Sequence, residues 1–205
     1  MSGSMSEADL LADLQRSLHD AASVFSAPLD ADWKRFLAAA LAAMSSKRPR
    51  TQLGAVTLVA DQDLYPLPAP VLADFLSYKT HLWGGRPGKP WMPGYAGALP
   101  RVSVHDNSLV FDPAPSAAHL LAHGSAFRFW YFCQHRVGAT AEECTINPVD
   151  RSLLILRAQV EAMRELAMRS ANKPVTVRDG FSGTPRNATP AALSAQLLDE
   201  WKAAP

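Results

Sequence analysis

Four histidine and cysteine side chains in the middle of the chain are the residues best suited to chemistry. His119 and His123, in PSAAHLLAHG, are four residues apart and would share one face of a helix, a spacing that zinc sites use. Cys133 and His135 are two residues apart and would point to the same face of a strand. Together they could hold a zinc ion that activates water, as in a metal hydrolase. The alternative is that they are packed structural side chains, because no Glu lies between the two histidines and no third ligand is evident nearby.

Motifs for other reactions are absent from the sequence. It has no Gly-x-Ser-x-Gly nucleophile elbow and no glycine pattern for a dinucleotide. The stretch GGRPGKP has too many prolines for a phosphate-binding loop and lacks Ser or Thr after its lysine. Carboxylate pairs such as Glu142 and Glu143 fit helix caps, and we expect Cys133 and Cys144 to be free thiols. We therefore expect a protein that is not an enzyme and that uses no metal or cofactor.

The composition is that of a globular chain without a strong overall charge. With 205 residues, 48% of them apolar, the chain can bury one core of good size, or a core plus an inserted subdomain. Its formal net charge of +1 argues against a protein that grips nucleic acid by charge alone. There is no run of about 18 apolar residues, and the first residues lack a signal-peptide pattern. We therefore expect a soluble, intracellular protein.

The strongest periodic signal in the sequence lies in residues 147–171. Apolar residues recur there at alternating spacings of three and four, which places one apolar stripe along a helix. A stripe of this kind predicts a helix that packs into a core. It consists of Leu153, Leu156, Val160, Met163 and Ala167.

Two segments near the N-terminus carry a matching stripe. The first is expected to begin with a capping box of Ser4 and Glu7 and to end near Pro28. Asp30 or Asp32 would cap the second, which stops at SSKRPR. The short loop between them predicts an antiparallel pair of helices.

The region between the second and third helices has β character. From Gly54 the apolar period changes to two, and the aromatic segment 75–83 also favours a strand. Residues 101–110 predict a hairpin with His-Asp-Asn at its turn. Residues 127–135 are apolar on both faces, which predicts burial on both, between two sheets or against a neighbouring subunit. Helices, then a sheet, then a helix predict an α+β fold.

One long loop and one basic cluster are candidates for contacts with other molecules. The Gly- and Pro-rich segment 84–100 is longer than a passive connection and carries Trp91, Met92 and Tyr95. Such residues tend to contact a partner, and the alternative is a loop folded back over its own sheet.

The basic cluster at the end of the second predicted helix has two interpretations. Lys47, Arg48 and Arg50 would complement the helix dipole and keep the surface soluble. In the alternative they would contact phosphate groups.

The C-terminal segment predicts an arm that ends in a helix. Residues 172–188 are extended and weakly apolar, and Thr189 and Pro190 then cap and open a final helix. A helix of about 14 residues is marginal alone in water, so it must dock on something. The arm could reach on the order of 50 Å if extended, so the docking partner could be another chain. The docking residues would be Thr189, Leu193, Leu197, Leu198 and Trp201.

The order of these elements resembles the head-to-tail adaptor, or connector, proteins of tailed bacteriophages. The motifs that carry the resemblance are DADWKRFLAAALAAM, VTLVADQDLYPLPAPV, SLVFDPAPSA, FRFWYFCQHRV, INPVDRSLLILRAQVEAMRELAMR and TPAALSAQLLDEW. It covers roughly Leu10 to Trp201. The step PSAAHLLAHGSA is longer than usual for that family, and GGRPGKPWMPGYAG looks like a local insertion.

The resemblance implies a structural virion protein of the neck. Its fold would be an antiparallel bundle of three main helices, with an antiparallel β domain inserted between the second and third, and an extended C-terminal arm. The domains would be 1–50, 51–138, 139–172 and 173–205, which are the helical pair, the β domain, the long bundle helix and the arm.

The family resemblance also implies partners. Twelve copies would form a ring between the portal protein and the tail or neck proteins, and double-stranded DNA would pass through it during genome ejection. The arm would dock on the portal, the loop 84–100 would contact the tail or a neighbour, and Lys47, Arg48 and Arg50 would face the DNA channel. The protein would be made in the host cytoplasm and would not contact a membrane.

A different class of function fits parts of the same sequence. The β domain could be a small binding module that takes a ligand or a strand of another protein. A solitary binding module, however, has little need of a capped terminal helix on a long tether.

Overall fold

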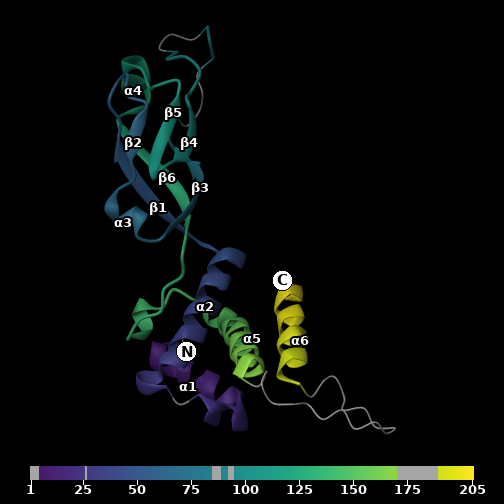
Figure 1. Cartoon of the computed structure of the whole chain (residues 1–205). Coiled ribbons are helices and arrows are strands. Elements are labelled where there is room, and N and C mark those ends of the chain that lie inside the picture. The colour runs from purple at the N-terminus through teal and green to yellow at the C-terminus, as the bar shows by residue number, and fades with distance from the viewer. Residues whose placement is uncertain (1–4, 26, 85–88, 92–94, 170–188) are drawn as a thin grey trace. The chain divides into compact units, whose positions relative to one another are not determined.

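The computed structural model describes residues 5–25, 27–84, 89–91, 95–169 and 189–205. The fold is mixed, with helices and two small antiparallel sheets, as the sequence predicted at this level. The chain forms two compact units, shown in Figure 1. Residues Met1–Arg48 and His135–Pro205 make the helical unit, and Pro49–Gln134 make the β unit. No helix among the described residues is long and apolar enough to cross a membrane.

The helical unit is built on one hydrophobic core. Side chains from the first, second and fifth α-helices meet in it, and Leu10, Phe36, Met44 and Leu154 are almost fully buried there. Phe25, Trp33 and Phe36 pack edge to face, with ring centroids 5.1–6.0 Å apart. The α-helices of this unit are α1 (Glu7–Ser17), α2 (Ala31–Lys47), α5 (Arg151–Arg169) and α6 (Pro190–Ala203), and its 3₁₀ segments are His19–Val24, Pro28–Asp30, Ala141–Glu143 and Pro148–Asp150.

The start and end of α1 differ from the sequence prediction. The capping box is formed by Ser6 and Asp9, and not by Ser4 and Glu7; Ser4 itself lies outside the described residues. The helix ends at Ser17, well before Pro28, because His19 adopts a left-handed φ of 47° and the chain continues as a 3₁₀ segment. A prediction from apolar spacing alone does not detect this change of backbone conformation.

The second and third predicted helices are present with shifted ends. Asp30 stands before α2 without a side-chain capping bond, and Asp32 lies in the first turn. The helix predicted for residues 147–171 begins as the 3₁₀ segment Pro148–Asp150 and is α-helical from Arg151. Its stripe is buried at Leu153, Val160 and Met163, whereas Leu156 and Ala167 are half-buried.

The β unit contains two three-stranded antiparallel sheets with strand orders β1-β6-β3 and β2-β5-β4. The predicted hairpin is confirmed, with Asp106 and Asn107 at positive φ between β4 and β5. The predicted strand at Gly54 begins earlier, at Arg50. The elements of this unit are β1 (Arg50–Thr57), β2 (Leu64–Pro66), α3 (Ala69–Leu72), β3 (Phe75–His81), β4 (Arg101–His105), β5 (Ser108–Asp112), α4 (Ala117–His123) and β6 (Ala126–Cys133).

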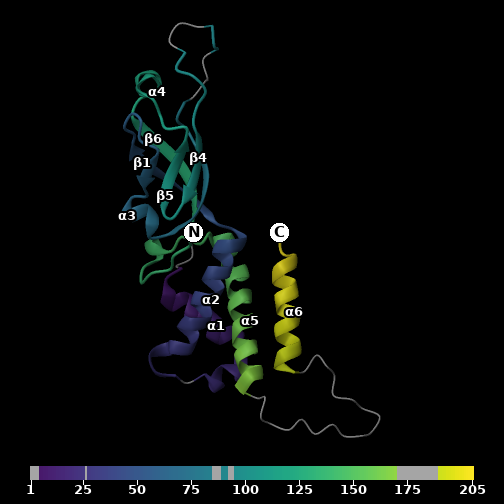
Figure 2. The same ribbon diagram turned by 45° about the horizontal axis from the view of Figure 1, so that its top comes forward.

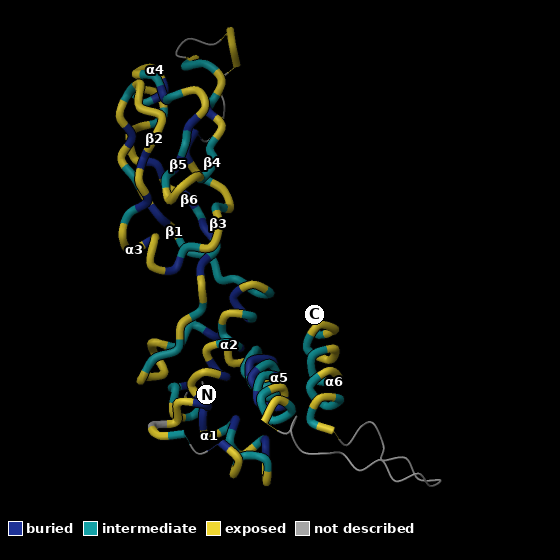
Figure 3. Tube along the Cα trace, viewed as in Figure 1, coloured by how far each residue is buried: buried dark blue, intermediate teal, exposed yellow. Residues whose placement is uncertain are grey.

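Strand β6 is the centre of its sheet, but only one of its faces is fully buried. Phe127, Phe129 and Tyr131 are at most 2% exposed and form the core of the β unit with residues of the other sheet. Trp130 and Phe132, which alternate with them, are half-buried on the opposite face. Figure 3 marks the buried positions in dark blue. Burial of both faces between two sheets of the same chain is therefore wrong, and burial of the outer face against a neighbouring subunit stays a prediction.

A close approach on β1 fixes how this core is filled. Gly54 is paired with Phe129, and a Cβ at position 54 would lie 2.6 Å from the Phe129 ring. Glycine is therefore required by the ring of its neighbour.

We predict that Gly54→Ala lowers the free energy of unfolding of the β unit by about 1–3 kcal/mol, because the added methyl overpacks the Phe129 ring. Ala55→Val is the matched control, since Ala55 is exposed on the other face of the same strand. Urea unfolding measures both variants. Equal stability of the two would show that the ring moves aside without cost.

Candidate docking site

Helix α6 lies against α5 of its own chain. The two helices run side by side in both views of the ribbon (Figures 1 and 2) and contact each other along their length. Leu193, Leu197 and Trp201 pack against the helical core, yet no residue of α6 is fully buried. The cap is the predicted one, with Thr189 Oγ1 accepting from the Ala192 N–H at 3.2 Å. The stripe that was expected to dock on another chain is thus in contact with its own chain in this structure.

Polar and cationic groups hold the C-terminal half of α6. The Lys47 ammonium lies 4.7 Å from the centre of the Trp201 ring and donates to the carbonyl oxygen of Lys202 at 3.1 Å. The Arg157 guanidinium lies 5.6 Å from the same ring. These contacts combine a cation–π attraction with a cation at the negative end of a helix dipole. Near the other end, the Ser194 hydroxyl donates to the Val160 carbonyl at 3.1 Å.

The contact between α6 and α5 leaves two buried donors without a hydrogen-bond partner. They are the indole Nε1 of Trp201 and one guanidinium nitrogen of Arg157. A buried donor without a partner costs roughly 1–3 kcal/mol. The interface therefore combines apolar and cation–π contacts with two unsatisfied donors, which favours a contact that can be broken.

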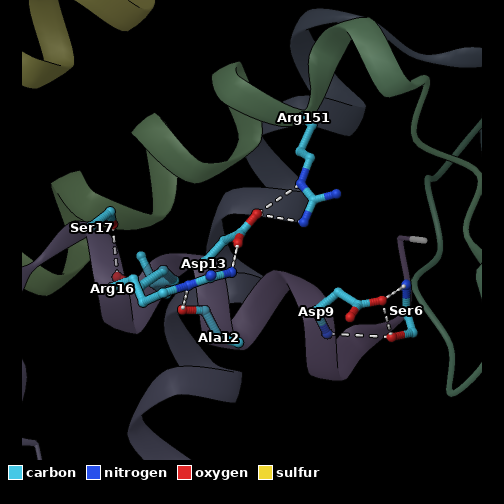
Figure 4. Close-up of polar contacts among 8 residues, drawn as sticks. Ser6, Asp9, Ala12, Asp13, Arg16, Ser17 and Arg151 are labelled. Atoms are coloured by element: carbon cyan, nitrogen blue, oxygen red, sulfur yellow. Dashed lines mark hydrogen bonds and ion pairs between the residues drawn. The ribbon is translucent and has the colours of Figure 1, made fainter. Parts of the chain in front are cut away.

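A cavity of about 780 Å³ opens beside this contact in the helical unit. Two ion pairs lie in its wall: Arg151 with Asp13, whose Nε to Oδ2 distance is 2.9 Å, and Arg48 with Asp150. Figure 4 shows the Arg151 side chain directed at the Asp13 carboxylate. The charges in the wall are balanced, and the remaining surface is largely apolar. The lining residues are Asp13, Ser17, Arg48, Val149, Asp150, Arg151, Ser152, Leu153, Ile155, Leu156, Gln159 and Ala204.

The basic cluster predicted from the sequence is divided between the two units. Lys47 and Arg48 end α2 in the helical unit, whereas Arg50 opens β1 in the β unit. Each has a partner within the chain: Lys47 binds the end of α6, Arg48 pairs with Asp150, and Arg50 pairs with Asp74 at 2.9 Å. Their charge is therefore partly neutralised, and a phosphate-facing or channel-facing role stays a prediction.

The long loop is described only in part. Trp91 is 75% exposed, and Lys89 lies 5.3 Å from the centre of its ring. Tyr95 is exposed as well, and Met92 lies outside the described residues. The exposed aromatic rings are accessible to a partner, and the contact with the tail or a neighbour stays a prediction.

The histidines proposed as metal ligands have structural surroundings. His119 caps α4, its Nδ1 accepting from the Ser116 N–H at 3.1 Å, and it is buried beside Trp83. His123 packs edge to face on Trp83 at 5.6 Å. The ring nitrogens of His135 lie 2.8 Å and 3.1 Å from the carbonyl oxygens of Arg48 and Thr145.

Cys133 is buried and Cys144 half-buried, and the two are not joined in a disulfide. Within the described part of the chain, no three His, Cys, Asp or Glu side chains are grouped to hold a metal ion.

An ion-pair network that the sequence did not indicate joins the start of α2 to the end of α5. Arg169 binds Asp32 at 2.9 Å and Glu165 at 3.0 Å, and Arg35 binds both carboxylates. Hydrogen bonds from Arg169 and Arg35 hold the pKa of Glu165 below its ordinary value. The i, i+4 spacing of Glu165 and Arg169 indicates an ion pair within α5, whereas their ion-pair partners on α2 depend on tertiary packing and cannot be predicted from spacing.

No protein-family model matches the sequence, and no curated protein matches it significantly.

We predict that the stability of the β unit falls as the pH drops below neutral. His81 faces the core beside Phe127, and its Nδ1 is within hydrogen-bond distance of the Tyr78 hydroxyl. Burial lowers the pKa of His81 and raises the pKa of Tyr78 to about 12. Below a pH of about 6.5 the unfolded chain therefore binds more protons at residue 81 than the folded chain, and stability is lost progressively.

The measurement is urea unfolding of the β unit between pH 7 and pH 5. The variant His81→Gln should show a smaller loss, and His105→Gln, which changes an exposed histidine, should behave like the original chain. A pH profile unchanged by His81→Gln would contradict the assignment.

Proposed function

We propose that this chain is a structural adaptor of the bacteriophage neck, without catalytic activity. In this proposal α1, α2 and α5 form the bundle, and the β unit is the insertion between its second and third main helices. Copies of the chain form a ring of about twelve that joins the portal to the tail and continues the channel for double-stranded DNA. The proposal is supported by the order of elements from Leu10 to Trp201 and by the properties of α6.

The observation that carries the proposal is the length of the connection between α5 and α6, which is much longer than two adjacent antiparallel helices need. Antiparallel helices in a bundle are commonly joined by about 2–8 residues. Helix α5 ends at Arg169 and α6 begins at Pro190, so residues 170–189 connect two helices that lie side by side. A chain of that length spans up to about 60 Å when extended. Such a connection allows α6 to leave α5 and dock on the portal while the rest of the chain stays folded.

The chemistry of the contact is compatible with this exchange. Helix α6 has no fully buried residue, and its interface keeps the indole N–H of Trp201 unpaired. A portal groove could bind the stripe of Leu193, Leu197 and Trp201 and accept a hydrogen bond from that N–H. The exchange of the internal contact for the portal contact would then have a small net cost in free energy. Differential affinity of this kind is what shifts a conformational equilibrium.

We predict that fixing α6 to α5 prevents docking on the portal. The Ser194 hydroxyl binds the backbone carbonyl of Val160, so Val160→Cys with Ser194→Cys, in a Cys144→Ser background, places one thiol on each helix where the two backbones approach. The oxidised chain should lose at least tenfold in affinity for purified portal protein from the same phage, and reduction should restore it. Ser194→Cys alone, treated with the same oxidant, is the control.

Docking is measured by sedimentation of the portal with labelled adaptor. Equal binding by the oxidised and reduced chains would show that α6 does not need to leave α5. Electron microscopy of particles carrying a tagged chain tests the wider proposal. A symmetric ring of label between head and tail supports an adaptor, and label that is absent from particles argues for a protein with another role.

A further inference from the structure

The outer face of the sheet β1-β6-β3 is a partly exposed apolar surface with positive charge. Because Phe127, Phe129 and Tyr131 point into the core, Arg128, Trp130 and Phe132 point outward. Leu53 is paired with Trp130 and is 46% exposed, and the Leu82 N–H donates to the Arg128 carbonyl, which sets Leu82, 60% exposed, beside Arg128. We call this surface the outer face; it comprises Leu53, Lys79, Leu82, Arg128, Trp130 and Phe132.

Within the three strands of this sheet, all of which the structure describes, no carboxylate balances the cations of the outer face. The sequences of the three strands, RTQLGAVT, FLSYKTH and AFRFWYFC, contain no Asp or Glu. Lys79 lies 5.0 Å from the centre of the Phe132 ring and donates to Thr51 Oγ1 at 3.4 Å, so its ammonium sits over the sheet. A partner surface for this face should carry apolar side chains together with carboxylates.

The same unit also presents a segment of opposite charge, in which exposed apolar residues lie beside carboxylates. Residues Val59 to Leu64, with sequence VADQDL, contain two exposed carboxylates, Asp61 and Asp63, and no basic residue. Val59 is 55% exposed and Leu64 is 51% exposed. We call this segment the acidic knob.

The acidic knob is held rigidly on the unit. The Tyr65 hydroxyl accepts from the Val59 N–H at 2.9 Å and donates to the Val59 carbonyl at 2.8 Å. The Asp61 N–H donates to the Pro115 carbonyl at 2.8 Å, with Asp61 in a left-handed conformation. Tyr65 belongs to the sheet β2-β5-β4 and Pro115 follows β5, so these bonds tie the knob to that side of the β unit. A rigid segment loses little entropy when it binds.

We propose that the outer face of one copy binds the acidic knob of a second copy. Lys79 and Arg128 would face Asp61 and Asp63, while Leu53, Leu82 and Trp130 would cover Val59 and Leu64. The contact uses two different surfaces, so it is heterologous and builds a closed ring or a filament instead of a symmetric dimer. This inference rests on the proposed function, which requires self-association, and it assigns the contact between copies to the β unit.

Charge reversal tests the pairing. The face variant carries Lys79→Glu with Arg128→Glu, and the knob variant carries Asp61→Lys with Asp63→Lys. Each variant alone sets like charges against each other, so sedimentation equilibrium at low salt should show self-association weakened on the order of tenfold or more. An equimolar mixture of the two variants, and a chain with all four changes, should associate again, because opposite charges then meet.

The control variant changes two exposed cations of the helical unit, Lys34→Glu with Arg164→Glu, and matches the charge change of the face variant. Absence of association of both the original and the four-change chain at about 1 mM would overturn the proposal. A loss no larger than in the control would do the same. Loss in the face variant without rescue by the knob variant would show that the face binds another partner, including a polyanion.

Portal docking by α6 is measured separately on the face variant at a concentration where it is monomeric. Retained docking with lost self-association separates the outer face from the docking helix. A chain that self-associates through the face but never docks on the portal would support this inference and contradict the proposed function.

Discussion

The structure depends on the packing of α2 against α5, two helices separated in sequence by the entire β unit. Ala40, Ala158 and Ala162 are fully buried in this packing, and small side chains let helix backbones approach closely. Because the two helices meet, the chain that leaves α2 has to return to it. His135 holds that return: its backbone N–H donates to Ser45 Oγ at 2.9 Å and its ring reaches the Arg48 carbonyl. The histidine that looked like a metal ligand therefore closes the helical unit.

Local signals in the sequence predicted those parts of the fold that local physics determines. The stripes predicted α2 and α5, the Asp106–Asn107 turn predicted the hairpin, and Thr189 predicted the cap of α6. The errors occurred where one residue changes the backbone. Apolar spacing continues past His19, but its left-handed φ ends α1 there. A second error concerns the start of β1. The alternation of apolar and polar residues begins only at Gly54, although the antiparallel pairing of β1 with β6 already starts at Arg50.

The sequence predicted which residues of α6 form a contact, but it did not predict what they contact. An amphipathic stripe shows that Leu193, Leu197 and Trp201 must be covered, but it does not show which chain covers them. Lys47 was read as a surface charge because its neighbours in sequence are basic, whereas its partner is the far end of the chain. Contacts of this kind, like the Arg169–Asp32 pair, arise from tertiary packing and leave no periodic trace in the sequence.

In the proposed assembly, the two units of the chain would carry two separate contacts. Surfaces with different chemistry belong to different units. The helical unit has a helix held by cation–π contacts from Lys47 and Arg157, and the β unit has a sheet face that combines apolar side chains with Lys79 and Arg128. The residues that hold α6, namely Lys47, Arg157 and Val160, are all in the helical unit. Many copies linked through their β units would then present many tethered helices together, and linked weak contacts bind far more strongly than single ones. An α6 contact with unsatisfied donors suits such an assembly. Each α6 would then leave its own chain if it bound the partner only slightly more tightly than it binds α5.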